Sequence, residues 1–334
     1  MAIKSYKGFD KNLRCRGFQY KIGGIYEMDG KIKMCNRGFH ACESPFDVFD
    51  YYTMIDSRFC EVEQDGNISK WDRGTKICSS KIKIKAELKL ADMINLGVEW
   101  LKEITSPEKI KTSIKDNSSG NNAQIGSSGN NAQIGSSGNN AKIGSSGDGA
   151  KIGSSGNNAQ IGSSGNNAKI GSSGNNAKIG SSGYGAQIGS SGYDAQIGSS
   201  GNNAKIGSSG YGAQIGSSGY GAQIGSSGYD AQIGSSGDGA QIGSSGYGAK
   251  ISSSGYGAKI DSTGEDCVIM CAGINSVAKA SKGSWVTLSE WSYSEEKQRY
   301  IPICVKTEFV DGEKIKADTY YSLKGGVFVE WIND

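Results

Sequence analysis

The sequence has no apolar run of the length that a signal peptide or a membrane span needs. Its first fifteen residues, MAIKSYKGFDKNLRC, contain no apolar core, and no segment approaches the ~20 apolar residues of a transmembrane helix. We therefore expect a soluble protein that stays in the cytoplasm.

The sequence also has little excess of charge of either sign. The chain carries 36 Lys and Arg residues against 33 Asp and Glu residues, a formal net charge of +3. The repeated central segment described below holds seven lysines and five aspartates. Neutralising the many phosphates of a nucleic acid and mimicking a DNA backbone both need a dense stripe of one charge, so we expect neither a nucleic-acid ligand nor a DNA-like surface.

Histidine and closely spaced cysteine pairs are almost absent. His40 is the only histidine, and it lies between Cys35 and Cys42 without the Cys-x-x-Cys pair of most structural zinc sites. Cys35, His40 and Cys42 are a candidate metal site, but core packing of the two thiols beside a hydrogen-bonded histidine is the favoured interpretation. With no export signal, we expect all eight cysteines to be reduced.

Motifs that carry catalysis are missing too. The chain has no phosphate-binding loop, paired-carboxylate motif or dinucleotide fingerprint. A strand would put His40 and Cys42 on one face, but no third group that would activate the thiol can be named. We therefore expect no cofactor and no enzymatic activity.

What the chain does have is a nine-residue repeat, Ser-Ser-Gly-x-x-Ala-Lys/Gln-Ile-Gly, present sixteen times without a gap over residues 118–261. Every unit keeps Ala and Ile two residues apart, and the residue between them is either Gln or Lys. On an extended strand, Ala and Ile then share a buried face and Gln or Lys points to solvent. Ser-Ser-Gly is expected to form the bend, because its glycine can take positive φ at little steric cost, and the variable pair that follows is also rich in turn-tolerant residues.

Nine residues are too few to enclose a core. We therefore predict a parallel β-solenoid (a β-roll or β-helix) in which two units make one flattened eighteen-residue turn. A triangular turn of three units is the alternative for an ordered repeat. The Gly- and Ser-rich composition also allows a disordered linker, but a linker has no reason to keep Ile at every ninth residue.

The unit is similar in length and glycine phasing to the nonapeptide rolls that bind calcium. Those rolls need an aspartate in every unit to ligate calcium between turns. The matching position here is alanine throughout, from Ala123 to Ala258. We therefore expect no calcium dependence.

Tyrosine enters the variable pair of the repeat only from the eighth unit onward. If two units make one turn, alternate units share a side and the tyrosines form two columns. One column holds Tyr193, Tyr211, Tyr229 and Tyr247, and a broken one holds Tyr184, Tyr220 and Tyr256. These columns are candidate binding surfaces for a partner or a glycan, although stacking that stabilises neighbouring coils is the favoured interpretation.

The segments on either side of the repeat predict two domains that cap the rod. Residues 1–117 are expected to form an α+β domain, with helices near 44–52 and 91–104 among its strands. Residues 262–334 are expected to continue the nine-residue spacing in degenerate form to residue 279 and then to form a small β domain. The predicted fold class is therefore mainly β.

Two glycine dipeptides mark expected hairpin turns in the carboxy-terminal domain. These are Asp311-Gly312 and Gly325-Gly326. Each stands between stretches rich in β-branched and aromatic residues, so we expect four short strands after residue 284.

Three segments carry a resemblance to a known group of proteins. CRGFQYKIGGIYE (15–27), CNRGFHACESPFDVFDYY (35–52) and VDGEKIKADTYYSL (310–323) resemble an uncharacterised family of phage and prophage repeat proteins. In that family, similar end domains bracket Ser-, Thr-, Asn- and Gly-rich repeats of varying number. The resemblance implies a mobile-element origin and an accessory or counter-defence role inside the bacterial host.

These observations favour a non-enzymatic binding or scaffolding protein that inhibits or sequesters a host protein and binds no membrane. Side-to-side packing of a solenoid face would also permit a homo-oligomer. The rival is an enzyme with its site in residues 1–105, where Arg16 to Phe18 and Gly38 to Cys42 resemble core motifs of ADP-ribosyltransferases. That resemblance implies that Arg16 holds a dinucleotide, and Glu61 and Glu63 are candidates for the catalytic glutamate by position only.

Overall fold

A computed structural model describes residues 2–53, 56–71, 74–105 and 120–332 of the chain. The chain divides into two compact units, Met1–Trp100 and Leu101–Asp334. In the residues described, no helix combines the length and the apolar character that crossing a bilayer requires.

The first unit is β-rich and contains an antiparallel sheet with the strand order β4-β7-β5-β1-β6. Because β6 also pairs with β7, the four longer strands close on themselves around a core that includes Phe9, Phe39 and Val62. A separate short hairpin joins β2 and β3. The strands are β1 (Ile3–Phe9), β2 (Arg14–Cys15), β3 (Phe18–Gln19), β4 (Ile25–Glu27), β5 (Phe39–Cys42), β6 (Arg58–Lys70) and β7 (Lys76–Leu88).

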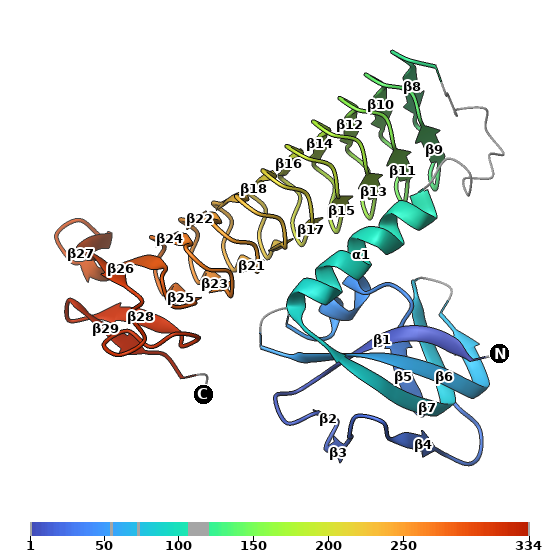
Figure 1. The fold of residues 1–334 in the computed structure, drawn as a ribbon, viewed down its shortest axis with the longest axis horizontal. Coiled ribbons are helices and arrows are strands. Elements are labelled where there is room, and N and C mark those ends of the chain that lie inside the picture. Colours follow the sequence, from blue (N-terminus) through green and yellow to red (C-terminus); the bar gives the residue numbers. More distant parts are fainter. Residues whose placement is uncertain (1, 54–55, 72–73, 106–119, 333–334) are drawn as a thin grey trace. The chain divides into compact units, whose positions relative to one another are not determined.

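One of the two expected helices of this unit is confirmed and the other differs. The helix expected at 91–104 is α1 (Leu90–Thr105), and Figure 1 shows it as one continuous helix. The helix expected at 44–52 is a short 3₁₀ segment, η1 (Phe46–Asp50). Ser44 Oγ accepts the backbone N–H of Asp47 at its start, and the segment ends before the chain continues to β6. The expected amino-terminal cap of the rod includes residues 106–117, which lie outside the described residues.

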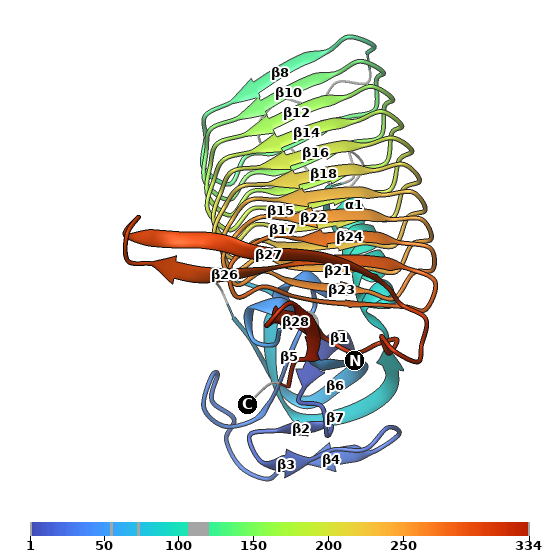
Figure 2. The same ribbon diagram turned by 90° about the vertical axis from the view of Figure 1, so that its left-hand side faces the viewer.

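The repeats form the predicted parallel β-solenoid of about nine turns over residues 124–288, shown edge-on in Figure 1. Each unit gives one four-residue strand, and each strand pairs in register with the strand eighteen residues away, as Ile143 does with Ile161. Two repeats therefore make one turn, which confirms the predicted flattened coil. Consecutive units fall alternately into two sheets, and Figure 2 looks onto the sheet of even-numbered strands.

The strands of the even-numbered sheet are β8 (Gln124–Ser127), β10 (Lys142–Ser145), β12 (Gln160–Ser163), β14 (Lys178–Ser181), β16 (Gln196–Ser199), β18 (Gln214–Ser217), β20 (Gln232–Ser235), β22 (Lys250–Ser253) and β24 (Val268–Cys271). Those of the odd-numbered sheet are β9 (Gln133–Ser136), β11 (Lys151–Ser154), β13 (Lys169–Ser172), β15 (Gln187–Ser190), β17 (Lys205–Ser208), β19 (Gln223–Ser226), β21 (Gln241–Ser244), β23 (Lys259–Ser262) and β25 (Val277–Ala280).

The interior of the solenoid is made of columns of small and branched side chains. Ala and Ile of successive coils are buried as predicted, for example Ala195 and Ile197. The first serine of each unit, which was expected in the bend, instead ends the strand and points inward, so its side chain is buried as well. Its hydroxyl has no hydrogen-bond partner among the described residues at fifteen successive positions, from Ser136 to Ser262. The core is therefore continuous but thin and partly polar.

Of the turn-tolerant positions expected in the repeat, the structure uses the variable pair and not the glycine of Ser-Ser-Gly for positive φ. That glycine does not have positive φ; the fifth residue of the unit does, and it is always Asn, Asp or Gly, as at Asn203 (φ 54°) and Gly212 (φ 67°). The third-position glycine is required for a different reason. A Cβ on Gly201 would overlap the carbonyl oxygen of Gly183 in the preceding coil, so only glycine lets consecutive turns stack this closely.

The carboxy-terminal end closes the solenoid with two hairpins. The degenerate units to residue 279 supply β24 and β25, as expected, and β26 (Trp285–Ser294) adds one further parallel strand on β24. β27 (Arg299–Phe309) then pairs antiparallel with β26, and β28 (Tyr321–Lys324) pairs with β29 (Val327–Glu330).

One of the two expected hairpin turns is confirmed. Gly325 and Gly326, with φ of 57° and 70°, connect β28 to β29. The hairpin expected at Asp311-Gly312 is wrong, because β27 has already paired with β26 through the turn at 295–298. Asp311 Oδ1 instead accepts the backbone N–H groups of Glu313 (2.9 Å) and Ile315 (3.0 Å), which makes a compact loop.

Candidate functional site

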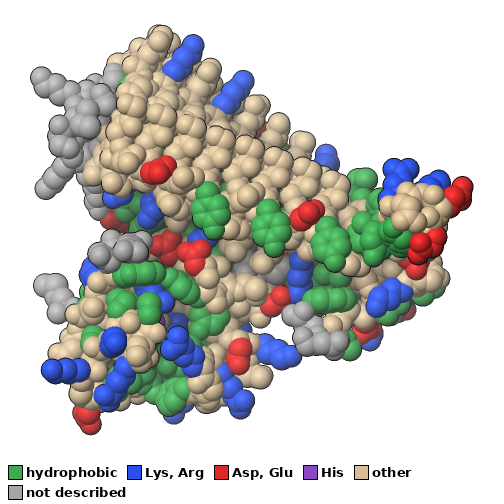
Figure 3. All heavy atoms as spheres, turned by 180° about the vertical axis from the view of Figure 1, so that it is seen from behind, with side chains coloured by type: hydrophobic (Ala, Val, Ile, Leu, Met, Phe, Trp, Pro, Cys, Tyr) green, Lys and Arg blue, Asp and Glu red, His purple; other side chains and the backbone are tan. Residues whose placement is uncertain are grey.

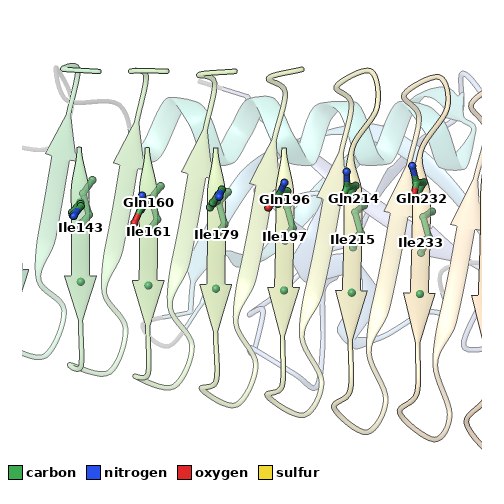
Figure 4. A pocket seen from close by; sticks show the side chains of 18 of the residues that line it. Ile143, Gln160, Ile161, Ile179, Gln196, Ile197, Gln214, Ile215, Gln232 and Ile233 are labelled. Atoms are coloured by element: carbon green, nitrogen blue, oxygen red, sulfur yellow. The ribbon is translucent and has the colours of Figure 1, made fainter. Parts of the chain in front are cut away.

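The outward face of the even-numbered sheet carries a continuous groove of about 1430 Å³. It is bounded by the Gln or Lys that begins each strand and by the glycine two residues later, which both point away from the core. Figure 4 shows Gln160, Gln196, Gln214 and Gln232 at the same height on their strands. Because neighbouring parallel strands are ~4.8 Å apart, the groove presents amide and ammonium groups at a fixed spacing.

The glycine column of this groove is not required by packing. A Cβ added at six of its positions, from Gly126 to Gly216, would meet no atom within 4 Å. Ser252 and Met270 already occupy the same position in the last coils. The groove is therefore open because these residues lack a side chain, and a Cβ at any of the six positions would meet no neighbouring atom.

The charge of the groove is weakly positive. Its first position is Lys in three of the coils, at Lys142, Lys178 and Lys250, and Gln in the others as far as Gln232. The outward strand positions that line the groove include no carboxylate. The surface therefore offers neutral amides, which both donate and accept hydrogen bonds, with a few isolated cations.

The tyrosines stand on the two edges of the solenoid, where the strands turn. The structure places Tyr193, Tyr211, Tyr229 and Tyr247 on one edge and Tyr184, Tyr220 and Tyr256 on the other, with 47 to 63% of each residue exposed. Figure 3 views one edge, along which separate hydrophobic side chains stand in a row.

Four of the tyrosine hydroxyls make hydrogen bonds to the next coil. The hydroxyls of Tyr184 and Tyr256 accept hydrogen bonds from Asn203 and Asn275 (both 2.8 Å). Hydrogen bonds to Asp230 and Asp266 raise the pKa of Tyr211 and Tyr247, and the rings of Tyr193 and Tyr211 lie 6.4 Å apart. This arrangement suits stabilisation between coils, and it leaves half of each ring exposed.

The first unit contains a second candidate site, a cavity of about 800 Å³ between β1, β5, the β2–β3 hairpin and β4. Its polar lining includes Lys7, Cys15, Arg16, His40 and Lys76. The sequence prediction had singled out Arg16, Cys35, His40 and Cys42, and the fold brings all four to this one cavity.

His40 is held neutral in this cavity. Burial and the positive charges of Lys76, Lys7 and Arg16 lower the pKa of His40 to about 4. Its Nε2 accepts the backbone N–H of Cys35 at 3.0 Å. The one histidine of the chain is therefore a hydrogen-bond acceptor at neutral pH.

The candidate zinc ligands lie near one another in different environments. Cys42 is buried, whereas Cys35 is exposed and its thiol accepts a hydrogen bond from Lys76 Nζ at 3.7 Å. Across the described ranges, no group of three His, Cys, Asp or Glu side chains is arranged to hold a metal ion. All eight cysteines are free thiols.

The two glutamates suggested for catalysis point elsewhere. Glu61 pairs with Lys4 at 2.9 Å and Glu63 pairs with Lys85 at 2.7 Å, and neither lines the cavity. The sequence prediction missed Lys7, which lies on the same face of β1 as buried Phe9. Lys7 is two residues from Phe9, and on a strand this spacing predicts that both side chains lie on the same buried face.

Comparison with known proteins adds one match. Residues 3–96 match a domain of unknown function, DUF7666. No curated protein and no solved structure matches the chain. The first unit is therefore similar to an uncharacterised domain, and that match assigns no activity to it.

Proposed function

We propose that this chain is a non-enzymatic binding protein whose solenoid groove recognises a partner protein. The observation that carries the proposal is the glycine column. Glycine persists from Gly126 to Gly216 where an added Cβ would meet no atom within 4 Å, and glycine weakens a strand relative to other residues. Close approach of another chain to the strand backbone accounts for that retention.

The composition of the groove supports a protein partner. Isolated lysines among neutral amides cannot neutralise a phosphate backbone, whereas amides at fixed spacing complement backbone and side-chain polar groups of a polypeptide. The exposed tyrosines on the flanking edges add residues that are enriched at protein interfaces. Resemblance to phage repeat proteins supports a host partner inside the bacterial cell, which the chain would sequester or inhibit.

A variant that fills the groove tests the proposal. Threonine at Gly180, Gly198 and Gly216 adds side chains on three adjacent strands of the even-numbered sheet. The matched control replaces three exposed serines of the same coils, Ser182, Ser200 and Ser218, with threonine. Circular dichroism would establish that both variants keep the solenoid.

Capture from a bacterial lysate, followed by titration with the purified captured protein, provides the readout. We expect the wild type and the control variant to capture one protein in stoichiometric amount. The variant with threonine in the groove should not capture it. Equal binding by all three would contradict the role of the groove. Incubation with labelled nicotinamide dinucleotide tests the enzyme alternative. Label transfer that is lost in Arg16→Ala would support that alternative.

A further inference from the structure

The cavity of the first unit has a chemistry that the solenoid groove does not use. Its volume of about 800 Å³ falls within the range of small-molecule sites. We propose that this cavity binds a nucleotide, that is, a phosphorylated nucleoside. The inference depends only on residues of the unit Met1–Trp100 and is independent of the groove.

The cavity holds more positive than negative charge. Lys7, Arg16, Arg37 and Lys76 line it, and the lining includes one carboxylate, Glu27. That carboxylate already pairs with Lys81 at 3.1 Å. An anionic ligand would supply the compensation that the lining residues lack.

Lys7 is the strongest indication of an anion. Lys7 is only 5% exposed, and its Nζ donates hydrogen bonds to the carbonyl oxygen of His40 (2.9 Å) and to the thiol of Cys15 (3.5 Å). In the described part of the chain it forms no ion pair with a carboxylate. Burial lowers the pKa of Lys7, and its Nζ lies over the rings of Phe9 (5.4 Å) and Tyr20 (6.0 Å). Charge on such a buried amine is costly without a counter-ion, so its retention at a cavity wall points to a ligand that carries the opposite charge.

Arg16 is held at the rim by an unfavourable turn. Arg16 and Gly17 connect β2 to β3 with φ of 50° and 79°. Two-residue turns of this type favour Asn, Asp or Gly at both positions, and a long side chain there is strained. The turn nevertheless places a guanidinium at the cavity, and a guanidinium matches the geometry of a phosphate group.

An apolar wall lies beside these cations. Phe18 and Ile25 are 51% and 59% exposed although they line the same cavity. The ring of Phe18 packs edge-on against Tyr20 (4.8 Å) and Tyr26 (5.4 Å), which fixes its orientation. A ligand that covers this wall must have a flat, apolar part as well as an anionic one, and a nucleotide combines a base that stacks on aromatic rings with phosphate.

Calorimetric titration of the full chain with three probes tests the ligand class. We expect ADP to bind, and adenosine and inorganic pyrophosphate to bind about tenfold or more weakly because each offers only half of the required chemistry. Pyrophosphate binding as tightly as ADP would overturn the nucleotide assignment. Absence of ADP binding at millimolar concentration would overturn the site.

Two substitutions and one control locate the site. Arg16→Asn keeps a residue that tolerates the turn and removes the guanidinium, and Lys76→Gln removes the cation beside His40. We expect each to weaken ADP binding about tenfold. Lys85→Gln, on the same strand β7 but paired with Glu63 outside the cavity, should leave affinity unchanged. Equal affinity in all four proteins would contradict the proposal.

A measurement on the wild type removes any dependence on how the variants fold. His40 is the only histidine of the chain and lines the cavity, so a histidine-labelled sample gives one imidazole signal. We expect ADP to shift that signal with the midpoint found by calorimetry. An imidazole signal that stays in place at saturating ADP would refute binding in this cavity, whatever becomes of the groove.

Discussion

The close approach of consecutive coils makes one glycine substitution especially informative. In Gly201→Ala the new Cβ would stand well inside the 3.0 Å below which Cβ atoms essentially never approach other heavy atoms, and it would face a backbone carbonyl that cannot rotate away. The two coils must separate locally. Gly198→Ala, three residues earlier on the same coil, adds its Cβ where no atom lies within 4 Å.

The size of the effect follows from the hydrogen bonds around Gly201. Three backbone hydrogen bonds join the two coils there, donated by Ser200 (3.0 Å), Gly185 (2.9 Å) and Lys205 (2.8 Å). Each contributes about 1 kcal/mol net, so their loss lowers the free energy of unfolding by about 3 kcal/mol. Gly198→Ala removes none of them and restricts the unfolded chain, which predicts a gain of up to about 1 kcal/mol.

Urea unfolding followed by circular dichroism measures both variants. Hydrogen exchange would show whether the loss is concentrated in the coils next to residue 201, as nearest-neighbour stacking requires. Equal stability of Gly201→Ala and Gly198→Ala would refute the steric explanation for the third-position glycine.

Three further predictions test other parts of the structure. Ser199→Ala removes a buried hydroxyl that has no partner in the described residues, so the free energy of unfolding should rise by about 1 kcal/mol; a clear fall in the urea midpoint would contradict this. Gly257→Ala puts a Cβ at φ 62° where no atom lies within 4 Å, so it tests the backbone conformation alone. It should lower stability by about 1 kcal/mol or more, whereas Gly257→Asn should be tolerated; equal melting temperatures would count against the assigned turn. Hydrogen bonds from Lys314 and Lys306 lower the pKa of Glu308, so its stabilisation is complete above the ordinary glutamate pKa and is lost as pH falls through the lowered value. Glu308→Gln should remove that component, and unchanged acid melting curves in the variant would speak against it.

The solenoid could be predicted because its information is local and repeated. Ala and Ile two residues apart identify a half-buried strand, and a nine-residue unit is too short to close a coil. The reason for the third glycine could not be found in this way, because its contact is the carbonyl oxygen eighteen residues earlier. The inward serine was misassigned for a related reason, since serine is common in turns and only the stacked coil shows it to be buried.

The flanking regions were harder because distant strands decide their structure. Asp311-Gly312 has the composition of a hairpin turn, but β27 had already found its partner in β26. In the first unit, His40 and Cys35 attract notice as rare residue types. Lys7 and Lys76 belong to a type that is usually exposed, and only the pairing of β5 with β1 and β7 brings them to one cavity.

The eighteen-residue register is the claim on which the groove and its lining depend, and engineered disulfides test it directly. In a Cys35→Ser background, cysteines at Gln196 and Gln214 stand on adjacent strands in register, within the distance that a disulfide requires. We predict rapid cross-linking of this pair on mild oxidation, mapped by mass spectrometry, and none between Gln196 and Gln223. Preferential linkage of the second pair, twenty-seven residues apart, would indicate a three-unit coil and contradict the account.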